Sequence, residues 1–263
     1  MKKYFVIGNP IDHSLSPKLH NYWIRQKKID AVYDKIKLEE NELENIISKV
    51  REEKITGINV TVPYKKKIIP FLDKLSPEAE KSQSVNTIYK EENVIIGHNT
   101  DIAGFELAIR HSKYDLKGKN IFILGAGGVV SSLIVAIKKL DASKIIVSNR
   151  TKKKADDLKN SFKDIDLVNW REIPDFDMII NATSIGLKNE DGIKFDYSAV
   201  KSNKFFYDLI YNPKETIFLK KAKQFGNRTE NGKMMFIYQA HQAFTLWHKV
   251  MPIIDDETIK LLN

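Results

Sequence analysis

The chain has 263 residues, of which 42% are hydrophobic, and it carries a formal net charge of +9. This length accommodates one large domain or two small ones, and this composition excludes an intrinsically disordered chain. The sequence contains no cysteine, which excludes disulfides, thiolate catalysis and cysteine-ligated metals and is typical of a cytoplasmic protein.

The distribution of charged and apolar residues limits the partners that we expect. The basic residues fall in scattered runs without interleaved aromatic residues, which favours a solvated surface over a nucleic-acid site. Part of this charge can attract an anionic substrate and a phosphate-bearing cofactor. No apolar run approaches the ~18 residues of a membrane helix, so we expect no membrane partner.

Strand and helix patterns alternate in the first part of the chain, which indicates an α/β fold. Strands are predicted at residues 4–7, 31–36 and 57–62, helices at 40–53 and 101–111, and a hairpin at 86–89 and 94–96. Another helix is expected to begin at Ser16 and Pro17, with Ser16 as the N-cap and Pro17 in the first helical position. The polar joint at residues 116–119 is where this pattern places a hinge before a second domain.

The second part of the chain repeats the alternation. Strands are predicted at residues 121–124, 144–148, 178–181 and 205–209, and helices at 127–140, 152–162, 232–250 and 258–262. A series of this kind is typical of a Rossmann-like fold, with a parallel sheet between layers of helices.

A glycine-rich turn follows the strand at 121–124 and opens the next helix. Without a Cβ, the backbone of Gly125-Ala126-Gly127-Gly128 can turn tightly and approach a pyrophosphate, while the N-terminus of the helix offers N–H groups to it. Val130 departs from the small residue usual at this point, and a purely structural turn is the alternative interpretation. The position after a strand and before a helix favours a dinucleotide site.

The end of the following strand indicates which dinucleotide is bound. An acidic residue about 20 residues after the glycines would bind a free ribose 2′-hydroxyl. This chain instead has Asn149-Arg150-Thr151 there, and an arginine fork can hold a 2′-phosphate, with the Thr151 hydroxyl assisting. The pattern therefore predicts NADP rather than NAD, unless Arg150 serves only as a solvated residue at the start of the helix.

Polar residues at the start of the predicted helix at Ser16 and at the end of the predicted strand 57–62 indicate a binding site for a small hydroxylated acid. Ser14 and Ser16 can bind a carboxylate at the N-terminus of a helix, or simply cap that helix. Asn59 and Thr61 share one face of a buried strand, where their polar groups require partners such as ligand hydroxyls, and Lys65 follows at the end of that strand. Asp101 either caps the next helix or orients Lys65 as part of an acid–base pair.

Taken in order, these motifs resemble those of the shikimate dehydrogenases over nearly the whole chain. The matching segments are SLSP (14–17), NVTVPYK (59–65), VNT (85–87), NTDIAGF (99–105), GAGG (125–128), NRT (149–151), NATSIG (181–186), YNP (211–213) and the Gln239-Ala240 pair. The resemblance implies an α/β substrate-binding domain of residues 1–101 and 234–263 and a Rossmann-like NADP-binding domain of residues 102–233, separated by a cleft.

The resemblance also implies a role for individual residues. Lys65 and Asp101 match the catalytic pair. The expected substrate-binding residues are Ser14, Ser16, Asn59, Thr61, Asn86, Tyr211 and Gln239, of which Asn59 rests on its place on the strand face. The expected cofactor-binding residues are Gly125, Ala126, Gly127, Gly128, Asn149, Arg150, Thr151, Lys154, Thr183 and Gly232.

Some residues depart from the family pattern. Lys154 replaces a second arginine near the 2′-phosphate, which predicts a softer preference for NADP because a point charge is a weaker clamp than a fork. The residues after Gly232 are unusual and leave the contacts on the nicotinamide side open. His241 and His248 lie seven residues apart without a carboxylate at ligand spacing, so we expect packing rather than metal binding.

The sequence thus predicts an NADP-dependent oxidoreductase that interconverts 3-dehydroshikimate and shikimate, a step of chorismate and aromatic amino-acid biosynthesis. Two alternatives remain open at this stage: a dehydrogenase that acts on quinate with NAD, and a non-catalytic protein that senses ligand and nucleotide. Arg150 argues against the first and the retention of Lys65 and Asp101 against the second. The sequence leaves the oligomeric state open, and a homodimer is compatible with it.

Overall fold

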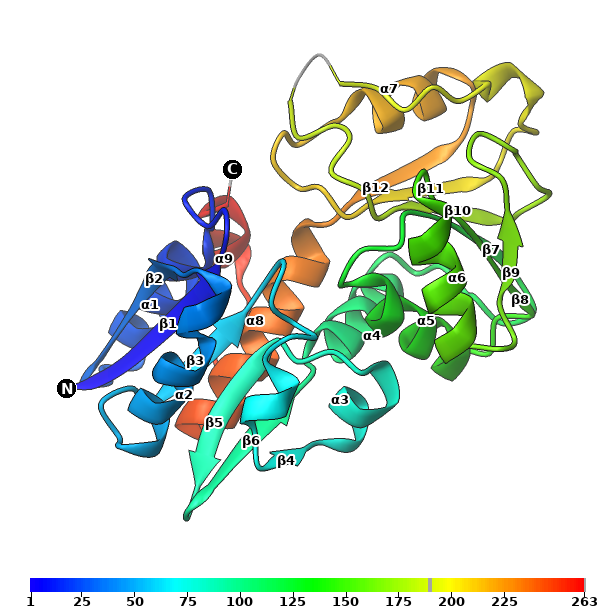
Figure 1. The fold of residues 1–263 in the computed structure, drawn as a ribbon. Helices are drawn as coiled ribbons and strands as arrows, with labels where there is room; N and C mark the ends of the chain where they lie inside the picture. Colours follow the sequence, from blue (N-terminus) through cyan, green and yellow to red (C-terminus); the bar gives the residue numbers. More distant parts are fainter. Residues whose placement is uncertain (189–190, 263) are drawn as a thin grey trace. The chain divides into compact units, whose positions relative to one another are not determined.

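A computed structural model describes residues 1–188 and 191–262 (Figure 1). The chain divides into two compact units, one formed by Met1–Phe105 with Phe236–Asn263 and the other by Glu106–Met235. Both divisions fall inside helices, namely α4 (Asp101–His111) and α8 (Lys233–His248). No helix among the described residues is long and apolar enough to cross a membrane.

The joint at residues 116–119 lies inside the second unit, so the hinge expected there is wrong. Leu116 is buried at 1% exposure, and the Gly118 amide donates to the Asp141 carbonyl over 2.9 Å. The Lys119 carbonyl accepts from the Ser143 amide over 2.9 Å. These contacts fix the joint against the turn before the next strand.

The first unit contains a mixed six-stranded sheet in the order β2-β1-β3-β5-β6-β4. Its strands are β1 (Lys2–Gly8), β2 (Ala31–Lys37), β3 (Gly57–Val60), β4 (Lys74–Leu75), β5 (Thr87–Glu91) and β6 (Val94–His98). Its other elements are α1 (Ser16–Gln26), the 3-10 turn η1 (Glu40–Glu42), α2 (Leu43–Arg51), η2 (Ile69–Phe71), α3 (Pro77–Ser82) and α9 (Asp256–Lys260). The expected hairpin is confirmed, because β5 and β6 pair in antiparallel register.

Two cores cover the two faces of this sheet. Alternate residues of β1 point to opposite faces, so Phe5 and Ile7 pack with the apolar side chains of α2 in one core. Tyr4 instead contacts the Trp247 ring of α8 with ring centroids 4.9 Å apart. This second core also contains His20 and Trp23 of α1, and it holds α1 and α8 against the sheet.

The second unit contains a six-stranded parallel sheet in the order β12-β11-β10-β7-β8-β9. Its strands are β7 (Asn120–Leu124), β8 (Lys144–Ser148), β9 (Asp166–Val168), β10 (Met178–Asn181), β11 (Phe205–Asp208) and β12 (Arg228–Asn231). Its helices include α5 (Val130–Lys139), α6 (Lys152–Ser161), η3 (Tyr197–Ala199) and α7 (Ile217–Gln224). Numbered within the unit, the strand order is 3-2-1-4-5-6, which is the doubly wound dinucleotide-binding order and confirms the expected Rossmann-like topology.

The strand order of this second sheet reverses between β7 and β10, which pair directly. In open α/β sheets, ligands bind beyond the carboxyl ends of the strands at such a reversal. The glycine turn at Gly125 follows β7, and Ala182 follows β10, so both segments lie at this point.

Candidate active site

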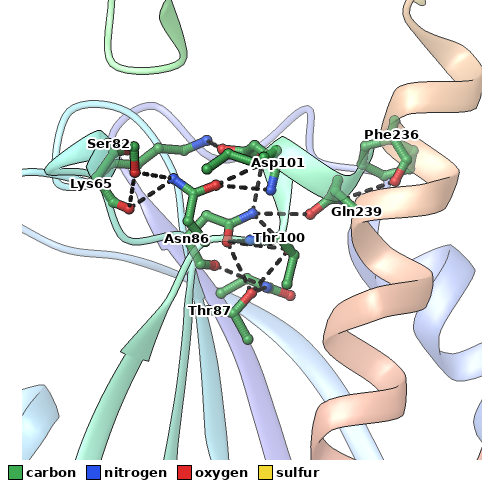
Figure 2. A network of polar contacts seen from close by, with 12 residues as sticks. Lys65, Ser82, Asn86, Thr87, Thr100, Asp101, Phe236 and Gln239 are labelled. Carbon is green, nitrogen blue, oxygen red and sulfur yellow. Dashed lines mark hydrogen bonds and ion pairs between the residues drawn. The ribbon is translucent and has the colours of Figure 1, made fainter. Parts of the chain in front are cut away.

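A buried ion pair joins Lys65 and Asp101 in the first unit (Figure 2). The Lys65 Nζ atom lies 2.5 Å from Asp101 Oδ2, and the exposed fractions of the two side chains are 11% and 7%. Burying two charges is costly unless they are well paired and their remaining groups are hydrogen-bonded. The second oxygen, Asp101 Oδ1, meets this condition because it accepts from Asn86 Nδ2 over 2.9 Å.

Asp101 is the first residue of α4, yet its side chain does not cap that helix. The Asn99 Oδ1 atom accepts from the Asp101 and Ile102 amides over 3.1 and 3.3 Å. Asn99 therefore satisfies the N-terminal amides of α4, and the Asp101 carboxylate is left to hold Lys65 and Asn86. Of the two sequence-based interpretations of Asp101, the structure supports the one in which it orients Lys65.

Asn86 connects this ion pair to the strand end and to α8 (Figure 2). Its amide group donates to Thr100 Oγ1 and Asp101 Oδ1, each over 2.9 Å, and lies 3.4 Å from Gln239 Oε1. Its side-chain oxygen, Oδ1, accepts from the Thr100 backbone amide over 2.7 Å. The network thus brings together the predicted residues Lys65, Asn86, Asp101 and Gln239, and it adds Thr100, for which no role was predicted.

Asn59 belongs to the same network but is turned toward protein groups. Its Nδ2 atom donates to the backbone carbonyl of Asn86 and to Thr87 Oγ1, each over 3.0 Å. Its Oδ1 atom accepts from the Tyr33 hydroxyl over 2.7 Å. Both amide hydrogens are therefore committed within the protein. Tyr33 was not identified from the sequence, because an apolar strand pattern gives no sign of where a phenol oxygen lies.

The two serines are placed differently from the expected cap. Ser16 is the first residue of α1 and not its N-cap, a position taken by Leu15 without a side-chain hydrogen bond. Ser14 Oγ accepts from the Ser16 amide over 3.3 Å, so Ser14 makes the local contact that was expected of Ser16. Ser16 is buried, whereas Ser14 and Thr61 are half-buried.

In the second unit, the glycine turn leaves space beyond β7. Gly125 has φ +115°, a conformation that favours glycine, and a Cβ there would lie 2.8 Å from the Ala182 carbonyl oxygen. A Cβ on Gly128 would meet no atom within 4 Å, and one on Gly127 only the Ala182 oxygen at 4.0 Å. Packing within the protein therefore requires Gly125 but neither of the other two, which fits a turn that a pyrophosphate approaches closely.

Helix α5 begins at Val130, three residues later than expected from the sequence. The glycines belong to the preceding turn because they carry no side chain to pack in a first helical turn. The N-cap residue of α5, Val129, makes no side-chain hydrogen bond to the helix, and the partial positive charge of this N-terminus favours an anion. Val130 is fully buried, so the departure from the family fingerprint is accommodated in the core.

Polar and basic residues follow β8. Asn149 Oδ1 accepts from the Ala126 amide over 3.1 Å and so ties this segment to the glycine turn. Arg150, Thr151 and Lys154 are exposed around the start of α6. A phosphate at the ribose end of a dinucleotide would find positive charge and hydroxyl donors here, so the residues present fit NADP.

The loops after β10 and β11 are joined through Asp208, which is fully buried. Asp208 accepts from Asn181 Nδ2 over 3.0 Å, from the Ile210 amide over 3.0 Å and from Thr216 Oγ1 over 2.6 Å. Burial raises the pKa of Asp208 to about 6, and these hydrogen bonds oppose that rise. Asn181 Oδ1 in turn accepts from Thr183 Oγ1 over 2.7 Å, so the Thr183 loop and the loop that carries Tyr211 share one anchor.

Tyr211 and Gly232 occupy the same end of this sheet. Burial raises the pKa of Tyr211 to about 12, so its hydroxyl is neutral at physiological pH. A Cβ on Gly232 would lie only 2.1 Å from the Leu209 carbonyl oxygen, which means that the backbone itself requires glycine there. This requirement is independent of any cofactor contact.

His241 and His248 pack in the first unit. The His241 ring is hydrogen-bonded with the Pro252 carbonyl over 3.0 Å and meets Trp23 edge-on. The His248 ring lies against Tyr4 and Phe244, with centroids 4.8 and 4.2 Å apart. Among the described residues, no group of three or more histidine, aspartate or glutamate side chains could hold a metal ion.

A doubly wound parallel sheet with a glycine turn at its switch point, in a chain that also buries a lysine–carboxylate pair, defines the class of dinucleotide-dependent oxidoreductases. Two family models match the chain. Residues 6–88 match the shikimate dehydrogenase substrate binding domain, and residues 106–205 match the model described as shikimate / quinate 5-dehydrogenase.

Individual relatives agree. The chain is 61% identical to the shikimate dehydrogenase (NADP(+)) of Pelagibacter ubique over the full length of both proteins. The crystal structure of shikimate dehydrogenase from Aquifex aeolicus matches with a TM-score of 0.91 and 37% identity, over 100% of this chain and 97% of that one. The Thermus thermophilus enzyme, solved with NADP(H) and shikimate, matches with a TM-score of 0.89 and 29% identity, over 100% and 98% of the chains. The chain belongs to the shikimate dehydrogenase family.

Proposed function

We propose that this protein catalyses the reversible reduction of 3-dehydroshikimate to shikimate with NADPH, within the pathway to chorismate and the aromatic amino acids. The observation that carries the proposal is the buried Lys65–Asp101 pair in a chain of this family. Relatives named as NADP(+)-dependent shikimate dehydrogenases support the choice of substrate and cofactor. The cysteine-free sequence supports a cytoplasmic location.

Lys65 acts as the general acid in this proposal. NADPH held by the second unit would supply the hydride that reduces the ring carbonyl. Lys65 Nζ donates a proton to the carbonyl oxygen as it becomes a hydroxyl, and in the reverse direction the amine takes that proton back. Asp101 orients the ammonium through its 2.5 Å contact and keeps its charge balanced, while Asn86 holds the other carboxylate oxygen.

The remaining polar residues of the first unit bind the substrate without taking part in the bond changes. Ser14 and Ser16 are assigned to the carboxylate, where a helix N-terminus adds a favourable dipole. The family resemblance assigns the substrate hydroxyls to Thr61, Asn86, Asp101 and Gln239. It also assigns Tyr211 as a further substrate contact. Asn59 was expected to contact substrate, but its committed amide favours a supporting role.

The cofactor site is assigned to the end of the second sheet. Gly125, Ala126, Gly127 and Gly128 accommodate the pyrophosphate, and Asn149 fixes their turn. Arg150, Thr151 and Lys154 bind the 2′-phosphate, and Thr183 lies on the loop after β10. Gly232 is assigned to this site by the family resemblance alone, because the backbone of Leu209 already requires glycine at that position.

Transfer of an isotope tests this assignment directly. The purified protein is incubated with 3-dehydroshikimate and NADPH that carries deuterium at the transferable position. We expect shikimate with one deuterium at the new carbinol carbon, detected by mass spectrometry. A parallel incubation with 3-dehydroquinate and deuterated NADH tests the quinate alternative. Formation of deuterated quinate without deuterated shikimate would replace the proposal by that alternative, and no product in either incubation would favour a non-catalytic role.

A further inference from the structure

We propose that Tyr33 is a positioning residue of the active site: its hydroxyl holds Asn59 near the end of β3, and through Asn59 it sets the geometry of Asn86 and the Lys65–Asp101 pair. The inference rests on the proposed function, because it assigns those groups to substrate and proton transfer. Tyr33 has no expected contact with the reacting atoms, since its side chain is 1% exposed.

The ring of Tyr33 is held firmly. It stacks on His20 with centroids 4.2 Å apart and an interplanar angle of 4°. The Asn21 side chain bonds the backbone of the same residue, donating to the Tyr33 carbonyl over 2.6 Å and accepting from its amide over 3.0 Å. A buried ring that is stacked on a neighbour, in a residue whose backbone is also hydrogen-bonded, gives its hydroxyl one well-defined position.

That hydroxyl determines the state of Asn59. The Tyr33 O–H donates to Asn59 Oδ1 over 2.7 Å, and the two hydrogens of Asn59 Nδ2 go to the Asn86 carbonyl and to Thr87 Oγ1. Thr87 Oγ1 then donates to Asn86 Oδ1 over 3.1 Å (Figure 2). Because Asn59 and Thr87 hold Asn86, and Asn86 holds Asp101, a loss at Tyr33 is transmitted to the group that orients Lys65.

Burial raises the pKa of Tyr33 well above its ordinary value. The phenol is therefore neutral throughout the working range of pH, and its hydrogen is available for Asn59 Oδ1.

The variant Tyr33→Phe removes only the hydroxyl and keeps the ring stacked on His20. The matched control is Tyr64→Phe, because Tyr64 is 2% exposed and its hydroxyl donates to the Leu38 carbonyl over 2.6 Å, outside the network. We expect kcat/KM for shikimate to fall about tenfold in Tyr33→Phe, as for a buried acceptor left without its donor. KM for NADP⁺ should not change, and Tyr64→Phe should keep the wild-type kcat/KM with a similar loss in Tm.

A double-mutant cycle separates positioning from general support of the fold. If Tyr33 acts through Asn59, then Tyr33→Phe combined with Asn59→Ala is no worse than Asn59→Ala alone. Additive losses would overturn the proposal, as would equal kcat/KM in the Tyr33 and Tyr64 variants. Failure of Tyr33→Phe to fold would also overturn it, because the hydroxyl would then hold the fold. The rate of the wild-type protein with shikimate tests the proposed function separately. The proposal for Tyr33 concerns only kcat/KM of each variant relative to the wild type.

Discussion

Lys65 and Asp101 bring opposite charges together from two segments that are 36 residues apart in the chain. We expect Lys65→Ala to lower kcat by about 10² to 10⁴, the usual contribution of a general acid or base, while KM for shikimate changes little. Steady-state rates with saturating shikimate and NADP⁺ measure this. Lys66→Ala is the control, because Lys66 is the exposed neighbour. A near-normal kcat in Lys65→Ala would remove Lys65 from the chemistry.

His20 makes the stability of the protein depend on pH. Its ring is fully buried, and both ring nitrogens lack hydrogen-bond partners among the described residues. Burial lowers its pKa to about 3, with a smaller contribution from His248, so the folded state binds the proton less readily than the unfolded state does. The stability that His20 contributes is therefore complete above pH 6.5 and is lost as the pH falls from 6.5 toward 3.

The variant His20→Phe keeps an aromatic ring but cannot take up a proton. Relative to this variant, the wild type should lose about 2 kcal/mol of unfolding free energy between pH 7.5 and pH 5. Urea unfolding at the two pH values gives the difference, and His248 titrates in both proteins, so it cancels. Parallel stability changes in the two proteins would show that His20 does not titrate on unfolding.

Among single residues, those of the candidate site that follow a strand end could be predicted from the sequence better than those inside a helix or strand. Lys65 and Asp101 could be predicted because polar side chains beside buried strands require partners, whereas Asn86 was implied only by the family resemblance. Tyr33 could not be predicted, because it lies on β2 and Asn59 on β3, and these two strands are brought together only by pairing with β1 between them. The local contact of Ser14 with the Ser16 amide, in place of an N-cap at Ser16, also escaped prediction, because either serine can accept from an N-terminal amide.

At the scale of elements, Asp208 joins the ends of β10 and β11 to the start of α7. Thr216 donates to the buried carboxylate over 2.6 Å and also accepts from the Leu219 amide as the N-cap of α7. The folded pKa of Asp208, about 6, lies above 3.8, so the charged form costs stability as the pH rises through this window. The hydroxyl of Thr216 offsets part of that cost.

We expect Thr216→Val to lower the free energy of unfolding by about 1–3 kcal/mol, and by more at pH 8 than at pH 5, where a protonated Asp208 depends less on the donor. Urea unfolding at the two pH values measures the loss. Ser198→Ala is the matched control, because Ser198 Oγ donates over 2.6 Å to the exposed carboxylate of Asp196. Equal losses in the two variants, or no pH dependence, would contradict the anchoring role of Asp208.

Hydrophobic patterns predicted the buried elements and missed the polar ones. The strands β7, β8, β10 and β11 read as apolar runs because parallel strands are covered on both faces. The edge strand β12 has the sequence Arg-Thr-Glu-Asn and the helix α7 is short and rich in lysine, so neither gives an apolar run or a long amphipathic pattern. The strand predicted over 57–62 ends at Val60, since residues 61 and 62 already belong to the turn before Lys65.

At the scale of the whole molecule, the first unit is assembled from both ends of the chain. Periodicity cannot reveal this arrangement, because it shows which residues are buried but not which segments share a core. Only the family resemblance implied that the C-terminal helices return to the substrate-binding part. The element types and the parallel character of the second sheet, in contrast, follow from the alternation of strands and helices.

Cofactor choice is a property of the second unit that one substitution tests. Arg150 is exposed after β8, where an acid would select NAD. We expect Arg150→Ala to raise KM for NADP⁺ about tenfold or more and to leave KM for NAD⁺ nearly unchanged, since only NADP⁺ carries the 2′-phosphate. High salt should weaken the wild-type preference in the same direction. Lys163→Ala is the control, an exposed lysine beyond the other end of α6. Equal losses with both cofactors would mean that Arg150 supports the fold.

The most direct measurement is the initial rate of nicotinamide reduction by the purified wild-type protein in four combinations: shikimate or quinate, each with NADP⁺ or NAD⁺. The buried Lys65–Asp101 pair and the basic segment after β8 predict that kcat/KM is highest for shikimate with NADP⁺, by about tenfold or more over each other combination. Measurable rates with NAD⁺ would still agree with this prediction, because Lys154 stands in place of a second arginine and softens the preference for NADP⁺. A higher kcat/KM with quinate and NAD⁺, or no reduction of NADP⁺ by shikimate, would contradict the account.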